Sequence, residues 1–154
     1  FGLALRAAGH GIKVLILQFM KGQKNIGEIE ALTKSNLPIK IKQFGRPGFV
    51  QSRACEPLDI YLADRGLKYF RDVLLHSDCG MIILDEILMA IDFGLLKEKA
   101  LCESLEMRPP HLHIVLTGRN ASDLILDMAD LVTEMKETKH PYKMGVKAQV
   151  GIEY

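Results

Sequence analysis

The stretch Val14-Leu15-Ile16-Leu17-Gln18 decides the fold class of this 154-residue chain. Its apolar run is too short for a helix and lacks the alternation of a strand with one exposed face. It therefore predicts a strand that is buried on both faces, as in parallel sheets. Two similar runs follow at residues 81–84 and 114–116, and each ends in polar or charged residues.

Helical patterns separate these runs. Apolar residues at spacings of three or four predict a helix over residues 58–75, with Gly66 as an interruption, and two helices over 87–107 that split near 92–94. Residues 3–9 predict a helix that ends at a glycine cap, and 122–127 a short helix capped by Asn120 or Ser122. Residues 39–44 alternate like a less buried strand, and 131–135 are a further strand candidate.

Alternating buried strands and helices predict an α/β fold, with a mainly parallel sheet flanked by helices and wound by right-handed crossovers. In such sheets, ligands bind beyond the carboxyl ends of the strands. Five polar residues at the ends of the runs are expected to converge there: Gln18, Asp85, Glu86, Thr117 and Arg119.

Asp85 and Glu86 are adjacent carboxylates at the end of a buried strand. Such a pair favours a divalent cation that is bound together with phosphate, as in nucleotide enzymes. Alternatively, one carboxylate caps the following helix and the other is solvated. Arg119 could bind a phosphate or pair with Asp85 or Asp123, and the residues alone leave these alternatives open.

Composition narrows the function classes. Twenty Lys and Arg against 19 Asp and Glu give a formal charge of +1, which offers no general attraction to nucleic acid or an anionic membrane. No apolar run approaches the roughly 20 residues of a membrane span, so we expect a soluble protein. Three cysteines outside any CxxC motif argue against a disulfide framework or a zinc site, and favour the reducing cytoplasm.

Three other segments have both a ligand-binding and a structural interpretation. The loop at residues 44–49 could lay its aromatic rings against a planar ligand or seal an edge of the core. His111 and His113 form a pair without a third metal ligand. The lysines between residues 136 and 147 are typical of a solvated face.

Several segments together carry a family resemblance. They are residues 1–11 (FGLALRAAGHG), 18–22 (QFMKG), 84–87 (LDEI), 116–119 (LTGR) and the closing stretch 139–154 (KHPYKMGVKAQVGIEY). In this order, over essentially the whole chain, they resemble the P-loop-type ATP:corrinoid adenosyltransferases.

The resemblance implies a RecA-like P-loop NTPase fold and a cytoplasmic homodimer. It also implies the transfer of the 5′-deoxyadenosyl group of ATP to the Co(I) centre of a corrinoid, with release of triphosphate, in adenosylcobalamin biosynthesis or salvage. The acceptor would be cob(I)alamin or cob(I)yrinic acid a,c-diamide, the metal Mg²⁺ or Mn²⁺, and the electron donor a reductase or flavodoxin. The alternatives are another P-loop phosphohydrolase or kinase, or a non-catalytic binder of nucleotide or corrinoid.

The resemblance also assigns residues by position. Glu86 matches the family's acidic residue near the metal and the nucleotide, with Asp85 as its partner at the strand end, so Glu86 is the expected catalytic residue and both are expected metal ligands. Arg6 and Arg119 match arginines on the nucleotide side, and Gln18 is expected to bind the nucleotide with them.

Two departures from the family pattern accompany these assignments. Phe49 falls in the loop that places aromatic residues against the corrin, but Gln51 stands where some members have tryptophan. No GxxxxGK[ST] motif occurs, and the chain opens inside a helix just ahead of a buried strand. We therefore expect residues 1–154 to form one N-terminally incomplete domain, with the first strand and a GxGKGKTT-like P-loop upstream of Phe1.

Overall fold

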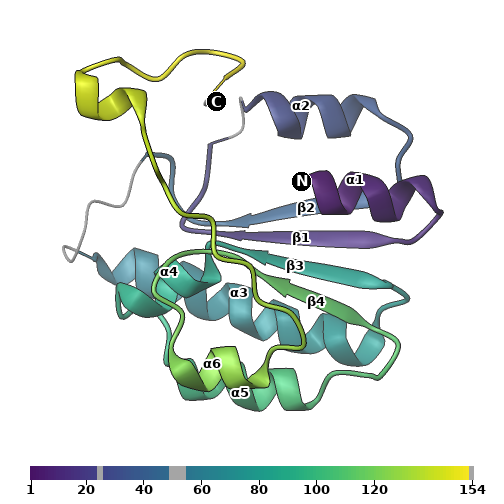
Figure 1. Cartoon of the computed structure of the whole chain (residues 1–154). Coiled ribbons are helices and arrows are strands. Elements are labelled where there is room, and N and C mark those ends of the chain that lie inside the picture. The colour runs from purple at the N-terminus through teal and green to yellow at the C-terminus, as the bar shows by residue number, and fades with distance from the viewer. Residues whose placement is uncertain (24–25, 49–54, 153–154) are drawn as a thin grey trace.

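The computed structural model describes residues 1–23, 26–48 and 55–152. It contains a sheet of four parallel strands in the order β2-β1-β3-β4 (Figure 1). The strands are β1 (Val14–Phe19), β2 (Ile39–Phe44), β3 (Met81–Asp85) and β4 (His113–Leu116). The predicted parallel α/β fold is confirmed.

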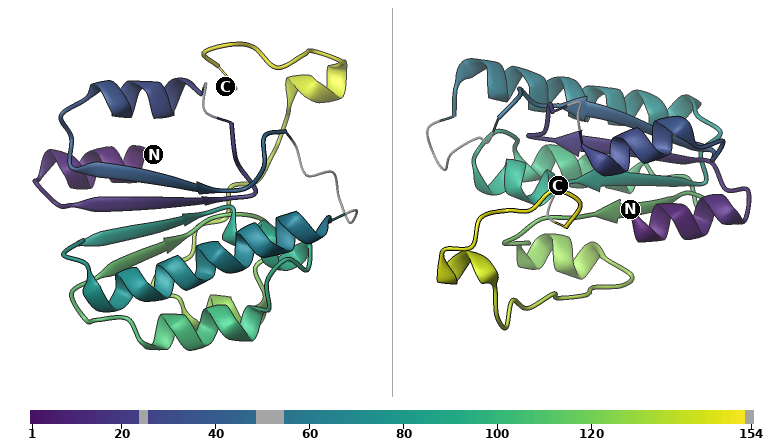
Figure 2. Two further views of the ribbon diagram at one scale, coloured as in Figure 1. Left: turned by 180° about the vertical axis from the view of Figure 1, so that it is seen from behind. Right: turned by 90° about the horizontal axis from the view of Figure 1, so that it is seen from above.

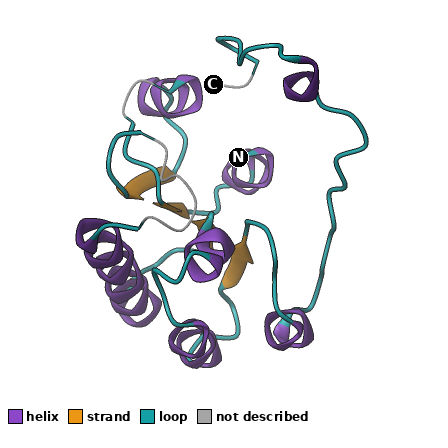
Figure 3. Ribbon diagram, turned by 90° about the vertical axis from the view of Figure 1, so that its left-hand side faces the viewer, coloured by secondary structure: helices purple, strands orange, loops and turns teal. Residues whose placement is uncertain are grey.

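Helices cover both faces of the sheet. They are α1 (Gly2–Gly9), α2 (Gly27–Lys34), α3 (Pro57–His76), α4 (Ile87–Asp92), α5 (Glu98–Glu106) and α6 (Asp123–Met128), followed by a 3₁₀ helix, η1 (Pro141–Met144). Figure 2 shows α1 and α2 on one side of the sheet and α3 and α5 on the other, and Figure 3 shows helices on both sides of the strands. The sheet is therefore the middle layer of the molecule.

The lack of alternation in β1 has a direct structural reason. Leu15, Leu17 and Phe19 belong to the larger core, which α3, α4, α5 and α6 complete. Val14 and Ile16 belong to the smaller core beneath α1. Because both faces of β1 are covered, apolar side chains are favoured at every one of these positions.

Gly66 is the contact point between α3 and the sheet. A Cβ atom at this position would lie 2.7 Å from Cε1 of Phe19 and 3.0 Å from Cγ of Phe44. The residue that interrupts the helical pattern in the sequence therefore lies at a close contact between the helix and the side chains of the strands.

The other predicted elements agree with the structure, with one exception. The 87–107 stretch divides into α4 and α5, and Ser122 is the cap of α6, with its Oγ accepting a hydrogen bond from the Ile125 N–H at 3.3 Å. The strand prediction for 131–135 is wrong. These residues contain no strand, and Leu131 and Met135 are 85% and 94% exposed, because no neighbouring strand pairs with them.

Two short elements, α2 and η1, were not predicted. Each is only one or two turns long and neither contains a buried residue, so the sequence signal of each is short. In the part of the chain that the structure describes, no helix has the length and apolar character to cross a membrane.

Candidate functional site

One hydrogen-bonded chain of side chains runs across the carboxyl edge of the sheet. Gln43 of β2 donates to Oε1 of Gln18 on β1 at 3.1 Å, and Gln18 donates to Oδ2 of Asp85 on β3 at 3.1 Å. From the other side, the hydroxyl of Thr117, which follows β4, donates to Oδ1 of Asp85 at 2.9 Å. The ends of all four strands are thus linked, as the convergence predicted from the sequence requires.

The Asp85 carboxylate is the end point of these bonds. It also receives Nζ of Lys21 on Oδ2 at 2.9 Å, and its side chain is only 17% exposed. Burial acts to raise the pKa of Asp85, but the hydrogen bond and charge of Lys21, together with Gln18 and Thr117, lower that pKa below its usual value. Asp85 is therefore ionised at neutral pH.

Glu86 differs from Asp85 in having a free carboxylate. Its backbone is left-handed, with φ 61°, and this turns the chain from β3 into α4. Its N–H donates to the Thr117 hydroxyl oxygen at 3.0 Å, which ties the turn to the end of β4. The half-buried Glu86 carboxylate makes no hydrogen bond or ion pair with any described residue, so it remains available to a ligand.

Neither carboxylate has the helix-capping role considered from the sequence. Glu86 is the N-cap residue of α4, but its side chain accepts no capping hydrogen bond, and Asp85 is occupied by the network. The sequence therefore identified the two residues, and the structure separates them into one carboxylate that is engaged and one that is free.

Gln18 was predicted to bind the nucleotide. Its side chain is fully buried and spans between Gln43 and Asp85, so every bond that the structure gives its amide is made to protein. Direct contact with a nucleotide stays a prediction.

Arg6 and Arg119 are exposed and stand apart from this network. Arg6 lies in the last turn of α1, and Arg119 follows Gly118 after β4. Among the described residues, Arg119 forms no ion pair with Asp85 or Asp123, the partners considered from the sequence. Both guanidinium groups are open to an anionic ligand, and their predicted nucleotide contacts remain predictions.

Phe49 and Gln51 lie outside the described residues. Arg46, shortly before them, is firmly held: it donates to both carboxylate oxygens of Asp59 at 2.9 and 3.0 Å and to Glu56 at 2.6 Å. The predicted contact of Phe49 with a corrin ring stays a prediction.

Sequence reasoning missed Lys21 and Thr117 as partners of Asp85. Both lie in segments that the sequence singled out, at the ends of the first and third apolar runs. The missing information was their mutual distance, because residues 21, 85 and 117 meet only once the strand order β1-β3-β4 is known.

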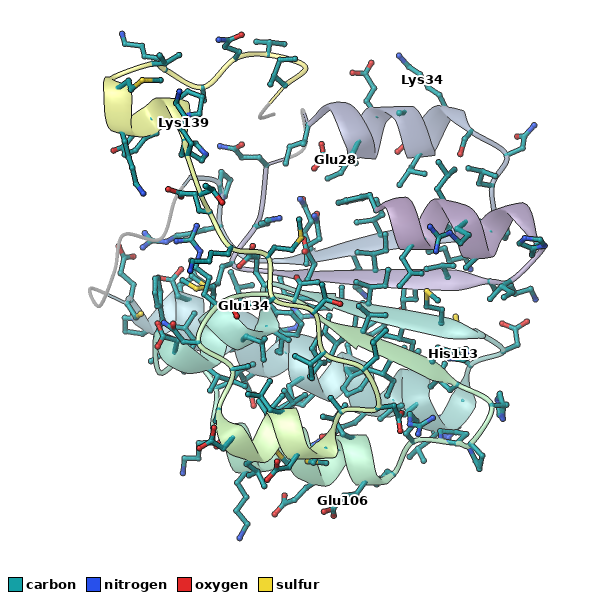
Figure 4. All side chains as sticks on the ribbon, viewed as in Figure 1. Glu28, Lys34, Glu106, His113, Glu134 and Lys139 are labelled. Atoms are coloured by element: carbon teal, nitrogen blue, oxygen red, sulfur yellow. The ribbon has the colours of Figure 1, made fainter. Side chains whose placement is uncertain are left out.

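The oxygen atoms at this edge suit a hard divalent cation. Mg²⁺ takes carboxylate oxygens and keeps several sites for phosphate and water, so the free carboxylate of Glu86 is a compatible ligand, with the engaged Asp85 carboxylate and the Thr117 hydroxyl beside it. Among the described residues, no group of three His, Cys, Asp or Glu side chains forms a complete protein cage. His113 stands at the amino end of β4, opposite this edge (Figure 4).

A parallel sheet between two helical layers, with an acidic pair at the carboxyl end of a central strand, is the architecture of P-loop NTPase-like proteins. Over residues 1–154 the chain matches the family described as ATP:corrinoid adenosyltransferase BtuR/CobO/CobP. The chain belongs to this ATP:corrinoid adenosyltransferase family.

Individual relatives agree. The chain is 35% identical to a corrinoid adenosyltransferase of Pseudomonas aeruginosa, over 100% of this chain and 75% of the relative. It is 34% identical to the corrinoid adenosyltransferase CobA of Salmonella typhimurium and 32% identical to a corrinoid adenosyltransferase of Escherichia coli, in both cases over 100% of this chain and 77% of the relative. The family and the transferase class predicted from the sequence are confirmed, in preference to the phosphohydrolase, kinase and non-catalytic alternatives.

Proposed function

We propose that this chain transfers the 5′-deoxyadenosyl group of ATP to the Co(I) centre of a corrinoid at the carboxyl edge of its sheet. The bond between C5′ of the ribose and the triphosphate oxygen breaks, a cobalt–carbon bond forms with the electron pair of Co(I), and triphosphate leaves. The observation that carries this placement is the free carboxylate of Glu86 beside the ionised Asp85, at the edge where parallel sheets bind ligands.

The site residues have separate tasks in this proposal. Glu86, with Asp85 behind it, holds Mg²⁺ or Mn²⁺ on the triphosphate side, and Arg6 and Arg119 supply positive charge to the phosphates. When bound, the metal ion offsets negative charge on the leaving triphosphate. Gln18 supports this arrangement by fixing the Asp85 carboxylate through its 3.1 Å hydrogen bond.

For corrinoid binding, the proposal depends on Phe49, the aromatic residue predicted to face the lower side of the corrin ring. Contact there would displace the lower axial ligand, so that Co(II) is more easily reduced to Co(I). An electron-donating reductase or flavodoxin, a homodimeric assembly and a cytosolic location complete the proposal, the last supported by the three free cysteines. The predicted single domain and upstream GxGKGKTT-like segment stay predictions.

An anaerobic assay tests the proposal. Full-length protein is mixed with MgATP and chemically reduced cob(I)alamin, while the Co(I) absorption band, the light-sensitive cobalt–carbon product and triphosphate are followed. We expect product and triphosphate in equal amounts, and neither without corrinoid. Release of ADP and phosphate, or ATP binding without product, would contradict the proposal.

Variants locate the reaction on the chain. Glu86→Gln keeps the size of the side chain and removes its charge, and it should lower turnover at least about 100-fold if Glu86 holds the metal. Glu106→Gln at the exposed C-terminal end of α5 is the matched control and should leave turnover unchanged (Figure 4). Phe49→Ala should impair reduction of bound Co(II) corrinoid more than ATP binding, and an equal loss of both would contradict the corrinoid assignment.

A further inference from the structure

Lys21 follows β1, and its ammonium group lies 2.9 Å from Oδ2 of Asp85. We infer that Lys21 is a positioning residue of this active site: it holds the Asp85 carboxylate across the ends of β1, β3 and β4, and so keeps Glu86 free to face the metal ion and the nucleotide. The inference rests on the proposed function for the role of Glu86. The pairing itself is a property of the folded chain.

The position of Lys21 is fixed by the backbone conformation of its two neighbours. Met20 is left-handed, with φ 59°, while its N–H still donates to the Phe44 carbonyl at 3.1 Å. Two residues later, Gly22 lies against Gly45, so closely that a Cβ on Gly22 would be 2.3 Å from the Gly45 carbonyl oxygen. Lys21 is thus held between two constrained residues and is not the end of a loose loop.

The surroundings of Asp85 explain why a cation is needed there. The carboxylate is largely buried, and its other two donors, Gln18 and Thr117, are neutral. A buried charge without a counter-charge is strongly unfavourable, so the pKa of the group shifts toward its neutral form. Among the described residues, Lys21 supplies the only cation paired with Asp85.

The influence of Lys21 reaches Glu86 through two hydrogen bonds. Asp85 accepts from the Thr117 hydroxyl, and the same oxygen of Thr117 accepts from the Glu86 N–H. A displacement of Asp85 therefore moves the group that holds the left-handed turn at Glu86. Lys21 acts on the free carboxylate without touching it.

The same two strands carry a second ion pair that serves as a control. Lys13 precedes β1 and pairs with Asp78, which precedes β3, at the opposite edge of the sheet. Its side chains are 58% and 75% exposed, against 37% and 17% for Lys21 and Asp85. Removing Lys13 thus deletes a lysine–aspartate pair between the same strands, away from the proposed site.

Activity measurements give the first test. In full-length protein, Lys21→Met should raise the Mg²⁺ concentration for half-maximal adenosylation about tenfold, the usual cost of losing a residue that orients a metal ligand. Lys21→Arg should restore most of this loss, and Lys13→Met should behave as wild type. A half-saturating Mg²⁺ concentration that is unchanged in Lys21→Met would overturn the inference.

Thermal unfolding of the substrate-free protein gives a second, independent test. Lys21→Met should lower Tm clearly in the wild-type background and much less in an Asp85→Asn background, because the lysine then has no charged partner. Equal Tm losses in both backgrounds would show that Lys21 does not act through Asp85. If wild-type protein forms no adenosylated corrinoid, the proposed function fails. The comparison of Tm losses in the two backgrounds still decides whether Lys21 and Asp85 are coupled.

Discussion

Gly22 and Gly45 bring two loops into direct backbone contact at the carboxyl edge of the sheet. A Cβ atom on Gly45 would lie 2.4 Å from the backbone nitrogen of Lys21, and one on Gly22 would lie 2.3 Å from the Gly45 carbonyl oxygen. These neighbours are backbone atoms, which cannot rotate away as a side chain can. The contact therefore holds the chain after β1 against the chain after β2.

Gly45→Ala is expected to separate these loops. The protein should lose about 1–3 kcal/mol of unfolding free energy, as for other overpacked positions, and turnover should fall because Lys21 is displaced. Gly9→Ala is the control, since a Cβ there would meet nothing within 4 Å. Urea unfolding of both variants checks the prediction, and equal midpoints would show that the loops can separate freely.

The substitution Glu86→Gly should have opposite effects on stability and activity. A non-glycine residue in the left-handed region costs on the order of 1–3 kcal/mol, so Glu86→Gly relieves strain at φ 61° while removing the free carboxylate. We expect an unchanged or higher Tm together with a large loss of adenosylation. A fall in both quantities would mean that the Glu86 side chain supports the fold.

Gly66→Ala sets helix propensity against packing. Alanine favours an α-helix over glycine by about 1 kcal/mol, but the added Cβ would lie 2.7 Å from the Phe19 ring. Overpacking at about 1–3 kcal/mol should win, and α3 should move outward with a lower Tm. The exposed Lys68→Ala on the same helix should change the stability by less than about 0.5 kcal/mol. A higher Tm for Gly66→Ala would show that the Phe19 ring yields.

Asp78 gives a pH-dependent contribution at the amino edge of the sheet. The hydrogen bond and charge of Lys13 hold the pKa of Asp78 below its ordinary value. Because the folded pKa is the lower one, this stabilisation is complete above the unfolded pKa of about 3.9 and is lost as the pH falls through the folded pKa. Asp78→Asn should therefore lower Tm at pH 7, and the difference from wild type should close as the pH falls through the pKa of Asp78 in the folded protein. A difference that stays constant with pH would exclude this origin.

The sequence predicted the fold because the decisive signals are local. The apolar runs of β1, β3 and β4 and the stripe of α3 each need only a few neighbouring residues to be recognised. The strand expected at 131–135 fails for the converse reason, since a strand also needs a partner elsewhere in the chain. Its residues carry suitable side chains but have no neighbouring strand.

The sequence predicted where the candidate site lies, but it did not predict the role of each residue in the site. Asp85 and Glu86 could be identified as a pair, but their division into an engaged and a free carboxylate depends on Lys21 and Thr117, which come from other strands. Gln18 looked like a ligand-binding residue at a strand end. Its burial follows from its register with Gln43 and Asp85 on the two neighbouring strands, which sequence spacing does not contain.

The chain of bonds across the four strand ends has a direction. Gln43 donates to Gln18, Gln18 to Asp85, and Thr117 to Asp85 from the other side, so every donor points towards one anion. An asparagine at position 85 would place an NH₂ donor among side chains that also donate, so Gln18 and Thr117 would have to reorient. In evolutionary terms, we expect these four positions to vary as a group, with an edge-strand glutamine inherited together with an acidic residue two strands away.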